Sequence, residues 1–532
     1  MNQIEIKRRQ AQAVSVILTL LTLAVVARMI GYNGAAYTAA AVEAFAMMWL
    51  VIGGNLTEAL GRLLRVRNSK GQYRNAEKLR RNTMIFQMFF GLLGSVLLLA
   101  GADWIAGNIL RMQYSTFILM VLSPAIFLRT VAAVLLGCFQ GEGSELPTAA
   151  AGILRQIFIL GLSLMFGRML GDYGSKVSRL LVQDNFTSMY GGVGVAIAIS
   201  VTEAFIVVFL FLIYKGSKRS RDPRRQEGMR AVDSFADSVR ILWSNRGMQW
   251  LTELMIFLPV PVGLIFLQKG TSNDASVGYG VYVSGYGVVC GCLTALILIS
   301  LLPVCGRVVI LLRKEEQRFA KTVFQCGVHI GVVHASFAAV FVAVMASQLS
   351  EVICPGQEQV VEQMLRGGSL VILFLALSMY LSRLLILLGD KILVAGSVGI
   401  SLVVYVVMLA VLLNREKTGV LALVYAGLLG LGVLCLLLGA FAFRQMRIRF
   451  DWLHVLVLPA GAAAVTGLIC MLLGRLFTPH LGGLVTVIVT LVVGFCIYWA
   501  LLILLRGFRE TELEVIPGGR LIRAVGQMLR VF

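Results

Sequence analysis

The sequence predicts an all-α polytopic membrane protein with about fourteen transmembrane helices, arranged as two six-helix lobes in parallel repeat and two further C-terminal helices. Three observations lead to this prediction. The 532 residues are 58% hydrophobic and only 14% charged, with a mean hydropathy of +0.86, which is too little polar composition to cover a water-soluble domain. The apolar residues gather in runs of about 20, the length that crosses a bilayer. A short basic hairpin sequence also occurs twice.

The apolar runs give the individual spans. Gly389, Asp390 and Lys391 form a polar break, so the apolar residues on either side are counted as two spans rather than as one long helix. The predicted spans cover residues 14–31, 36–60, 83–101, 114–138, 148–167, 191–214, 249–268, 276–303, 322–348, 368–388, 392–413, 418–443, 452–474 and 483–505.

The repeated hairpin predicts how the spans are grouped. Its first copy contains Gly61-Arg-Leu-Leu-Arg65 and its second contains Gly306-Arg-Val-Val-Ile-Leu-Leu-Arg313, and each joins two apolar segments. Because the repeat unit then holds an even number of spans, both copies insert in the same orientation, with the lobes related by an axis along the membrane normal. The predicted domains are a first lobe (1–214), a cytoplasmic linker (215–248), a second lobe (249–445), two added spans (446–505) and a cytoplasmic tail (506–532).

The distribution of Lys and Arg predicts the orientation. With the N-terminus inside, the cytoplasmic segments hold 34 of the 47 Lys and Arg residues, the external segments hold 9, and 4 lie within spans. The positive-inside rule therefore places both termini in the cytoplasm. The net charge of +20 then reflects topology, with anionic membrane lipids as expected partners and no nucleic acid. We interpret the first span as an uncleaved helix, since another span follows it at once.

The linker between the lobes predicts an amphipathic helix. Six apolar residues recur at helical spacing, and polar residues take the other face. This pattern favours a helix on the inner membrane surface, with packing against the cytoplasmic ends of the bundle as the alternative. The apolar residues are Val232, Phe235, Ala236, Val239, Leu242 and Trp243, and the polar ones are Asp233, Asp237, Ser238 and Arg240.

The sequence holds no catalytic constellation. It has no Ser-His-Asp set, no phosphate-binding loop and no metal-binding helix motif, and its nine cysteines are scattered, without metal-ligand spacing. We therefore expect neither an enzyme nor a cofactor, and no metal site.

Charged residues within the spans are the candidates for function. An Arg at the centre of a span costs about 2.5–3.5 kcal/mol on insertion scales, so Arg28, Arg129, Arg155 and Arg383 each need an explanation. Arg129 and Arg155 lie at one depth of a predicted hairpin, so they require an anion from the protein or from a substrate. A diphosphate would suit the planar donor fork of Arg.

Three features leave the roles of these residues open. Long arginine side chains can snorkel to the interface without any ligand. Arg28 could pair with Glu43, because both lie in the outer half of the membrane. Glu203 and Glu253 could satisfy other cations, and Glu43, Glu203 and Glu253 could instead bind a coupling cation or proton.

Glycines in the span 276–303 suggest close packing or a bend. Gly287 and Gly291 form a small-xxx-small pair, and Gly285 precedes them. Such residues allow helix backbones to approach closely, which is the default interpretation, and they also permit a bend that opens the lobes.

Several stretches resemble the polysaccharide-transport (stage V sporulation protein B-like) members of the multidrug/oligosaccharidyl-lipid/polysaccharide (MOP) exporter superfamily. Two positions depart from the family pattern: Leu136 stands where the family often has Arg, and Arg155 where it often has Glu. The similar stretches are Gly137-Cys-Phe-Gln-Gly141, Leu146-Pro-Thr-Ala149 and Gln156-Ile157; Arg28-Met-Ile-Gly31 with Gly34 and Tyr37; Gly71-Gln-Tyr73 with Ala76 and Lys78; and Glu512-Leu513 with Pro517-Gly-Gly-Arg520.

The resemblance implies a MATE/MOP flippase-like bundle that works by alternating access in the bacterial cytoplasmic membrane. It implies an undecaprenyl-diphosphate-linked saccharide as cargo, a precursor of cell wall, capsule or polysaccharide. In lipid II flippases of this superfamily, cavity arginines meet the diphosphate, and Arg28 is the position here that best matches such a role.

Three alternatives remain from the sequence. A cation-coupled multidrug exporter of the same fold would want an acidic, aromatic cavity. A non-transporting scaffold would hold cell-wall or polysaccharide synthesis enzymes. A membrane glycosyltransferase or ligase would want a large external loop with acidic or His residues, and the longest predicted external loop, near 168–190, offers only Asp172 and Asp184.

Overall fold

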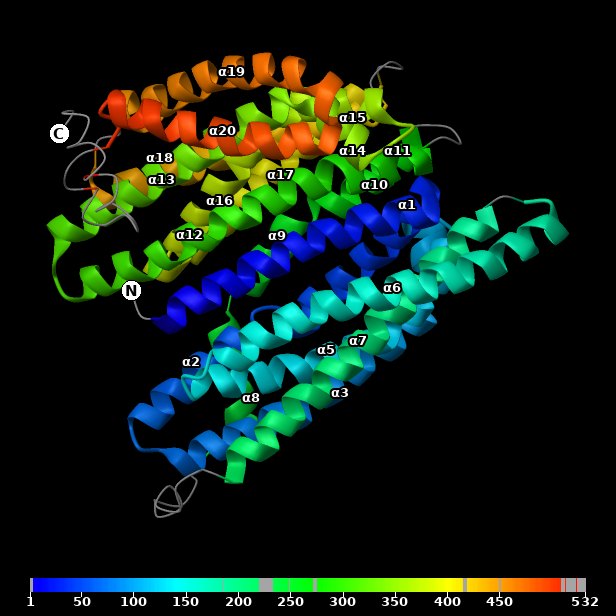
Figure 1. Ribbon diagram of the computed structural model, residues 1–532. Coiled ribbons are helices and arrows are strands. Elements are labelled where there is room, and N and C mark those ends of the chain that lie inside the picture. Colours follow the sequence, from blue (N-terminus) through cyan, green and yellow to red (C-terminus); the bar gives the residue numbers. More distant parts are fainter. Residues whose placement is uncertain are drawn as a thin grey trace. The chain divides into compact units, whose positions relative to one another are not determined.

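The structure is a computed structural model that describes residues 3–183, 185–219, 233–247, 249–270, 275–414, 419–448 and 451–508, together with 512 and 523. These residues are almost all helical, and no strand occurs among them (Figure 1). Thirteen helical segments in the described part are long and apolar enough to cross a membrane. The chain is therefore a multi-pass membrane protein, and the predicted fold class is confirmed.

The chain divides into two compact units, Met1–Val283 and Ser284–Phe532. The domain boundaries predicted from the repeat follow sequence symmetry rather than compactness, and they stay a prediction. Linker residues 220–232 and most of the tail, including Pro517-Gly-Gly-Arg520, lie outside the described residues.

The first unit contains α1 (Gln3–Gly53), α2 (Leu56–Ser69), α3 (Tyr73–Ala100), α4 (Ala102–Trp104), η1 (Ile105–Ile109), α5 (Ser115–Gly141), α6 (Leu146–Leu181), α7 (Asn185–Arg219), α8 (Phe235–Arg246), α9 (Gln249–Phe257), α10 (Pro259–Gly270) and α11 (Ala275–Val281). The π-helix η3 (Tyr282–Gly287) follows, and the division between the units falls within it. The second unit contains α12 (Val288–Arg313), α13 (Gln317–Val344), α14 (Ala346–Ile353), α15 (Glu358–Gly368), α16 (Val371–Leu388), α17 (Lys391–Leu413), α18 (Leu421–Met446), η4 (Leu453–Val457), α19 (Leu458–Leu481) and α20 (Gly483–Leu504).

A kink at Gly31 explains why thirteen segments are found where fourteen spans were predicted. The first segment runs continuously over 63 residues, or about 95 Å at 1.5 Å per residue, far longer than one bilayer thickness. Gly31 interrupts α1 with φ 76° and ψ 165°, outside helical geometry. Only glycine adopts such a conformation at little cost. The kink therefore falls between the predicted spans 14–31 and 36–60.

The predicted external loop near 168–190 is mostly helical, because α6 and α7 continue through most of it as an extended helical hairpin (Figure 1). Gly174 lets the two helices meet closely, since an added Cβ would lie 2.8 Å from the Phe186 carbonyl oxygen. Beyond it, the hydroxyls of Ser178 and Thr187 lie 3.1 Å apart. These local contacts between neighbouring turns keep the chain helical past the length needed to cross a membrane.

The two copies of the repeated hairpin form the same turn. Its central residue is left-handed in both, with φ 71° at Gly71 and 64° at Glu315. In both turns the next N–H donates to the carbonyl five residues earlier, at 2.9 Å and 3.1 Å. A second pair agrees: Gly143 between α5 and α6 has φ 80°, Gly389 between α16 and α17 has φ 110°, and each is followed by the same hydrogen bond at 3.0 Å. The same motif also ends α6 at Val182 and α18 at Arg447, so it is a general way of ending these helices, and the internal repeat stays a prediction.

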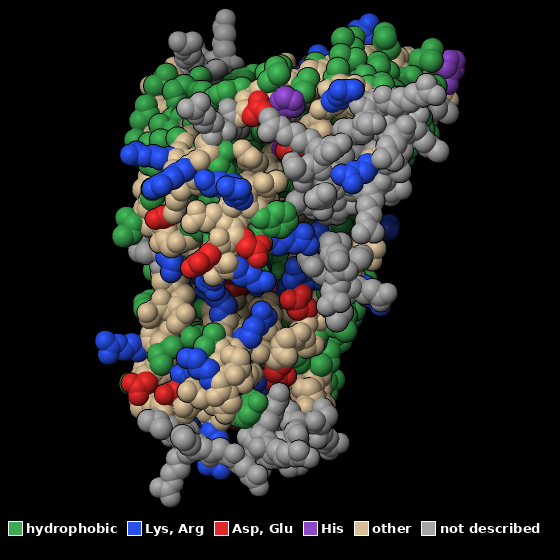
Figure 2. Space-filling model, turned by 90° about the vertical axis from the view of Figure 1, so that its left-hand side faces the viewer, with side chains coloured by type: hydrophobic (Ala, Val, Ile, Leu, Met, Phe, Trp, Pro, Cys, Tyr) green, Lys and Arg blue, Asp and Glu red, His purple; other side chains and the backbone are tan. Residues whose placement is uncertain are grey.

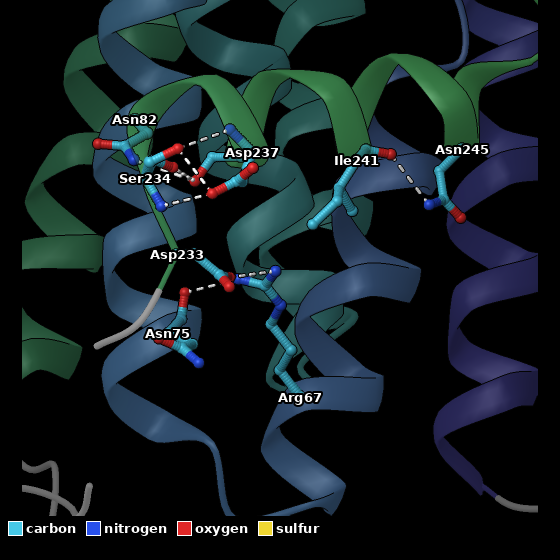
Figure 3. A network of polar contacts seen from close by, with 9 residues as sticks. Arg67, Asn75, Asn82, Asp233, Ser234, Asp237, Ile241 and Asn245 are labelled. Carbon is cyan, nitrogen blue, oxygen red and sulfur yellow. Dashed lines mark hydrogen bonds and ion pairs between the residues drawn. The ribbon is translucent and has the colours of Figure 1, made fainter. Parts of the chain in front are cut away.

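The linker helix is present as α8. Its first turn carries a capping box: Ser234 Oγ accepts from the Asp237 N–H at 3.0 Å, and the Asp237 carboxylate accepts from the Ser234 N–H at 3.0 Å. The Ser234 hydroxyl also donates to the Asp237 carboxylate, and this bond together with that from the Ser234 N–H lowers the pKa of the Asp237 carboxyl. Just before the cap, Asp233 forms an ion pair with Arg67 of α2 (Figure 3). The start of α8 is thus fixed to its neighbours by polar contacts.

α8 buries part of its polar face and leaves most of its apolar stripe exposed. Ser238, Leu242 and Arg246 are buried, whereas Phe235 and Trp243 are 46% and 49% exposed. Val232 lies outside the described residues. The helix packs against α2 and α3 through this buried face, and most of its apolar stripe faces outwards. The predicted position of that stripe on the membrane surface stays a prediction. Hydrogen bonding decides the orientation, because Asn82 of α3 donates to Ser238 Oγ at 3.0 Å in the buried contact (Figure 3).

Arg246 closes α8 against the end of α1. Its Nε donates to the Gly54 carbonyl at 3.0 Å and its Nη2 to the Val51 carbonyl at 3.2 Å. The last carbonyls of a helix lack intrahelical partners, and a cation there also complements the helix dipole. Burial lowers the pKa of Arg246 to about 10, so the guanidinium stays protonated at neutral pH.

Exposed basic side chains are frequent on the described surface. Figure 2 shows Lys and Arg side chains among fewer Asp and Glu. In the first unit, exposed basic residues stand at the α2–α3 turn and on α8, including Arg62, Arg65, Lys70, Arg74 and Arg240. These segments are the ones that the positive-inside rule assigns to the cytoplasm.

Candidate functional site

A charged cluster lies within the membrane-spanning helices of the first unit. Arg155 of α6 donates through Nη2 to Glu203 Oε2 of α7 at 3.0 Å, and Glu203 is 2% exposed. Arg129 of α5 lies within electrostatic range of both groups. The sequence predicted that Arg129 and Arg155 need an anion, and Glu203 supplies one of them with a protein partner.

Aromatic rings surround the second arginine of this cluster. The Arg129 guanidinium carbon lies 5.7 Å from the ring centre of Phe45 and 5.2 Å from that of Trp49, both on α1. Such cation–π contacts stabilise a guanidinium that has left water. They do not cancel its charge, so Arg129, Arg155 and Glu203 together carry a net charge of +1.

The cluster also keeps an unused hydrogen-bond donor. Arg155 Nε is buried and has no hydrogen-bond partner within the described part of the chain. A buried donor without a partner costs free energy, and an incoming anion would relieve that cost. The arrangement can therefore accept one more negative group.

Arg28 stands alone on α1. It is exposed, and the described residues offer it no ion pair or hydrogen bond. The Arg28–Glu43 pair that the sequence allowed is not formed. The two residues lie on opposite sides of the kink at Gly31.

Glu43 instead meets a tyrosine from a distant part of the sequence. The Tyr279 hydroxyl of α11 donates to Glu43 Oε1. Glu43 is 6% exposed, and its Oε2 is buried without a hydrogen-bond partner among the described residues. One carboxylate oxygen is thus satisfied and the other is available to a proton or cation.

The approach of α11 to α1 explains how this contact forms. Ser276 Oγ donates to Asn33 Oδ1 at 2.9 Å, just beyond the α1 kink. At Gly280 an added Cβ would lie only 1.9 Å from the Tyr32 carbonyl oxygen, so no larger residue fits there. Glycine at 280 therefore brings Tyr279 within reach of Glu43.

The other charged candidates lie elsewhere. Arg383 is partly buried on α16 of the second unit, within electrostatic range of Cys305. Glu253 lies on α9, where its charge acts on Arg246. Neither belongs to the Arg129–Arg155–Glu203 cluster, and their predicted roles stay predictions.

Gly285, Gly287 and Gly291, the glycines noted in the sequence, lie where the π-helix η3 changes to the α-helix α12. Gly285 and Gly287 belong to η3, a form that is often found at functional sites. An added Cβ at Gly285 would lie 3.0 Å from Val361 Cγ2, so this position is packed, whereas one at Gly291 would meet nothing within 4 Å. The hinge role of Gly285 and Gly287 remains a prediction.

Sequence reasoning missed three partners of the charged groups. The rings of Phe45 and Trp49 sit four residues apart on α1, a spacing that signals one helix face but names no partner. Tyr279 is 236 residues from Glu43. No sequence pattern could have joined them.

Within the described ranges, no group of three or more His, Cys, Asp or Glu lies where it could hold a metal ion.

Comparison by sequence finds no matching family model and no matching curated protein. Comparison by structure finds close likeness at low identity. A multidrug resistance MATE family transporter of the MOP superfamily, in an inward-facing conformation, matches with a TM-score of 0.63 and 13% identity over 83% of this chain and 98% of that one.

Two further solved structures agree. The lipid II flippase MurJ, in an inward closed conformation, matches with a TM-score of 0.59 and 12% identity over 93% of this chain and 98% of that one. A MOP superfamily transporter from Pyrococcus furiosus matches with a TM-score of 0.62 and 14% identity over 83% of this chain and 95% of that one. The chain therefore has the MATE/MOP flippase-like fold.

Proposed function

We propose that this protein is a flippase of the polysaccharide-transport type in the bacterial cytoplasmic membrane, with both termini cytoplasmic. It moves an undecaprenyl-diphosphate-linked saccharide, a cell-wall, capsule or polysaccharide precursor, across the membrane by alternating access. The observation that carries this proposal is the cluster of Arg129, Arg155 and Glu203, which keeps a net positive charge and a buried donor without a partner.

In the proposed mechanism a diphosphate completes the charge of this cluster. Its oxygens accept from the planar forks of Arg129 and Arg155, which suit phosphate geometry. Arg28, exposed on α1 and without an ion pair among the described residues, supplies a further positive charge. The saccharide follows the diphosphate, the lipid tail stays in the bilayer, and no covalent bond changes.

The extent of the structural matches supports a flippase over a drug exporter. MurJ matches 93% of this chain, whereas the MATE transporter matches 83%. The difference is about 50 residues, the length of two membrane-spanning helices with their connection. The present chain has two helices, α19 and α20, after the last helix of the second repeat.

A reconstitution experiment tests the proposal. Purified protein in liposomes is given an undecaprenyl-diphosphate saccharide in one leaflet, and a membrane-impermeant label reports its arrival in the other. We expect transport by the wild type and by Lys314→Gln, an exposed control. Arg129→Gln should lower transport about 10- to 100-fold, since a charge-assisted hydrogen bond contributes about 1.5–3 kcal/mol. No transport by the wild type would refute the proposal.

Depletion of this protein in the cell that produces it gives a second test, with the lipid-linked intermediates as the readout. Accumulation of an undecaprenyl-diphosphate saccharide in the inner leaflet is expected. Unchanged lipid intermediates together with drug sensitivity would favour the multidrug exporter. Unchanged intermediates without drug sensitivity, and normal growth with Arg28→Glu, would favour a scaffold for cell-wall or polysaccharide synthesis enzymes.

One observation favours the cation-coupled multidrug exporter as the second candidate. Glu43 is buried with one oxygen held by Tyr279 and the other without a partner in the described chain, as a site for a coupling proton or cation would be. Glu43→Gln keeps the shape and the acceptor for Tyr279 but loses the charge. In either transporter we expect this variant to stop responding to a proton or sodium gradient, and only the exporter would lose drug efflux with it.

A further inference from the structure

An open groove separates α8 from α3. Its volume is about 570 Å³, within the range of roughly 300–1,000 Å³ found for ligand sites. Its lining is almost wholly apolar, with Phe86 of α3 on one side and residues of α8 on the other. The lining residues are Phe86, Phe235, Ala236, Val239, Arg240, Trp243 and Ser244.

The groove has fixed walls. The start of α8 is held by its capping box and by the Arg67–Asp233 ion pair, and its end by Arg246 on the α1 carbonyls. Between these ends, Leu242 is fully buried in a core cluster with Leu60 of α2. The groove therefore remains open because α8 is anchored through its opposite face.

The groove lies where a membrane surface is expected. On α3 the groove is lined by Phe86, four residues after Asn82, which donates to Ser238 of α8. Phe86 lies at the start of the apolar part of α3. Trp243 of α8 packs against Trp250, the first residue of the next membrane-spanning segment, with ring centres 6.3 Å apart. Tryptophans prefer the interface between lipid tails and headgroups.

The charge around the groove is positive. Arg240 lines it and is exposed. Lys78 of α3 and Arg240 both act electrostatically on Asp237. The Asp237 carboxylate is the acidic group beside them, and it is already engaged by the backbone N–H and hydroxyl of Ser234. An anionic headgroup thus meets Arg240 at the groove itself, with Lys78 and the ionised Asp237 within electrostatic range of one another.

We infer that this groove binds one anionic phospholipid of the adjacent leaflet, with an acyl chain along Phe86, Phe235 and Trp243 and its phosphate at Arg240. An exposed apolar groove beside a membrane span is covered by lipid rather than by water. The positive rim selects an anionic headgroup over a zwitterionic one. This site is separate from the Arg129 cluster and does not depend on the transported substrate.

Native mass spectrometry of the full-length protein in detergent tests the inference, with phosphatidylglycerol and phosphatidylcholine as probes. We expect one phosphatidylglycerol to bind more tightly than phosphatidylcholine. Arg240→Glu should weaken that binding at least about fivefold, the effect of one basic residue at an anionic surface. Val239→Trp should fill the groove and weaken both lipids. Lys314→Glu, an exposed charge reversal in the second unit, should bind as the wild type does.

Fluorescence gives an independent readout on the intact fold. Phosphatidylglycerol with brominated chains should quench the wild type more than Trp243→Phe, because Trp243 lines the groove. Three results would overturn the inference: wild-type binding by both Arg240→Glu and Val239→Trp, equal binding of the two phospholipids, or equal quenching of the wild type and Trp243→Phe. Preferential displacement of phosphatidylglycerol by undecaprenyl phosphate would also overturn it, since the groove would then hold a polyprenyl chain.

Discussion

Glu203 accepts a hydrogen bond from Arg155 at 3.0 Å between two membrane-spanning helices. The same carboxylate also acts electrostatically on Arg129. The pair joins α6 to α7 in the first unit. It leaves Arg129 with aromatic rings as its direct neighbours. One acidic side chain therefore sets both the stability of the cluster and its remaining positive charge.

Removing this carboxylate should destabilise the protein. Glu203→Gln leaves two cations without a charged partner, and breaking a buried ion pair from one side costs about 3–5 kcal/mol. Arg155 is 22% exposed, so we expect the lower end of that range. The measurement is the melting temperature of the purified protein. Adding Arg155→Gln should recover part of the loss, and an unchanged melting temperature for Glu203→Gln alone would contradict the role given to this pair.

Loss of Arg246 should loosen the junction between α1 and α2. Arg246→Met keeps much of the apolar stem but leaves the carbonyls of Gly54 and Val51 without their donors. Hydrogen bonds to charged groups contribute about 1.5–3 kcal/mol. Hydrogen exchange should therefore rise at residues 51–56 and along α8. Arg240→Met, on the exposed face of the same helix, is the matched control, and equal exchange in both variants would speak against the cap.

The N-terminus of α8 should respond to acid. Hydrogen bonds from Ser234 lower the folded-state pKa of Asp237 below its ordinary value. For a carboxyl with a depressed pKa, the stabilisation is present above the ordinary pKa and is lost as the pH falls through the folded value. The protection of amides in the first turn of α8, measured against their intrinsic exchange rate at each pH, should thus fall as the pH drops below about 4. Asp237→Asn should exchange faster at neutral pH and lose this acid response; retention of the response would assign it to another group.

The repeated turns offer a matched pair of substitutions. Glu315 adopts φ 64° where the first repeat has Gly71 at φ 71°, and a left-handed conformation costs a non-glycine residue about 1–2 kcal/mol. Glu315→Gly should therefore raise the melting temperature. Gly71→Ala should lower it through backbone strain alone, because nothing lies within 4 Å of the added Cβ. Opposite signs are the expected result, and equal signs would argue against a shared geometry.

Most of the fold could be predicted from the patterns of hydropathy and charge. The runs of apolar residues gave the spans, and Gly389 was correctly taken as a break. What failed was local: the stretch 168–190 is polar enough to suggest a loop, yet Gly174 and Ser178 allow two helices to pack through it. Composition reports whether a segment suits lipid, and it does not report where a helix ends once it has left the membrane.

The charged site was only half predictable. A lone charge within an apolar span is conspicuous, so Arg129, Arg155, Glu203 and Glu43 could be selected. Their partners could not, because Tyr279 reaches Glu43 across 236 residues of sequence and through a kink at Gly31. For α8 the helix was predictable, but the contacts of its other face were not, since Ser238 and Arg246 find their partners on distant parts of the sequence.

The attachment of Arg246 to the end of α1 also changes what the connector between the two repeats can do. Gln249, the first residue of α9, is only three residues further along the chain. A displacement of α9 therefore has almost no free chain to absorb it before it pulls on the junction of α1 and α2. The connector is therefore short and anchored at Arg246. A movement at the start of the second repeat is transmitted directly to α1, the helix that carries Arg28 and Glu43.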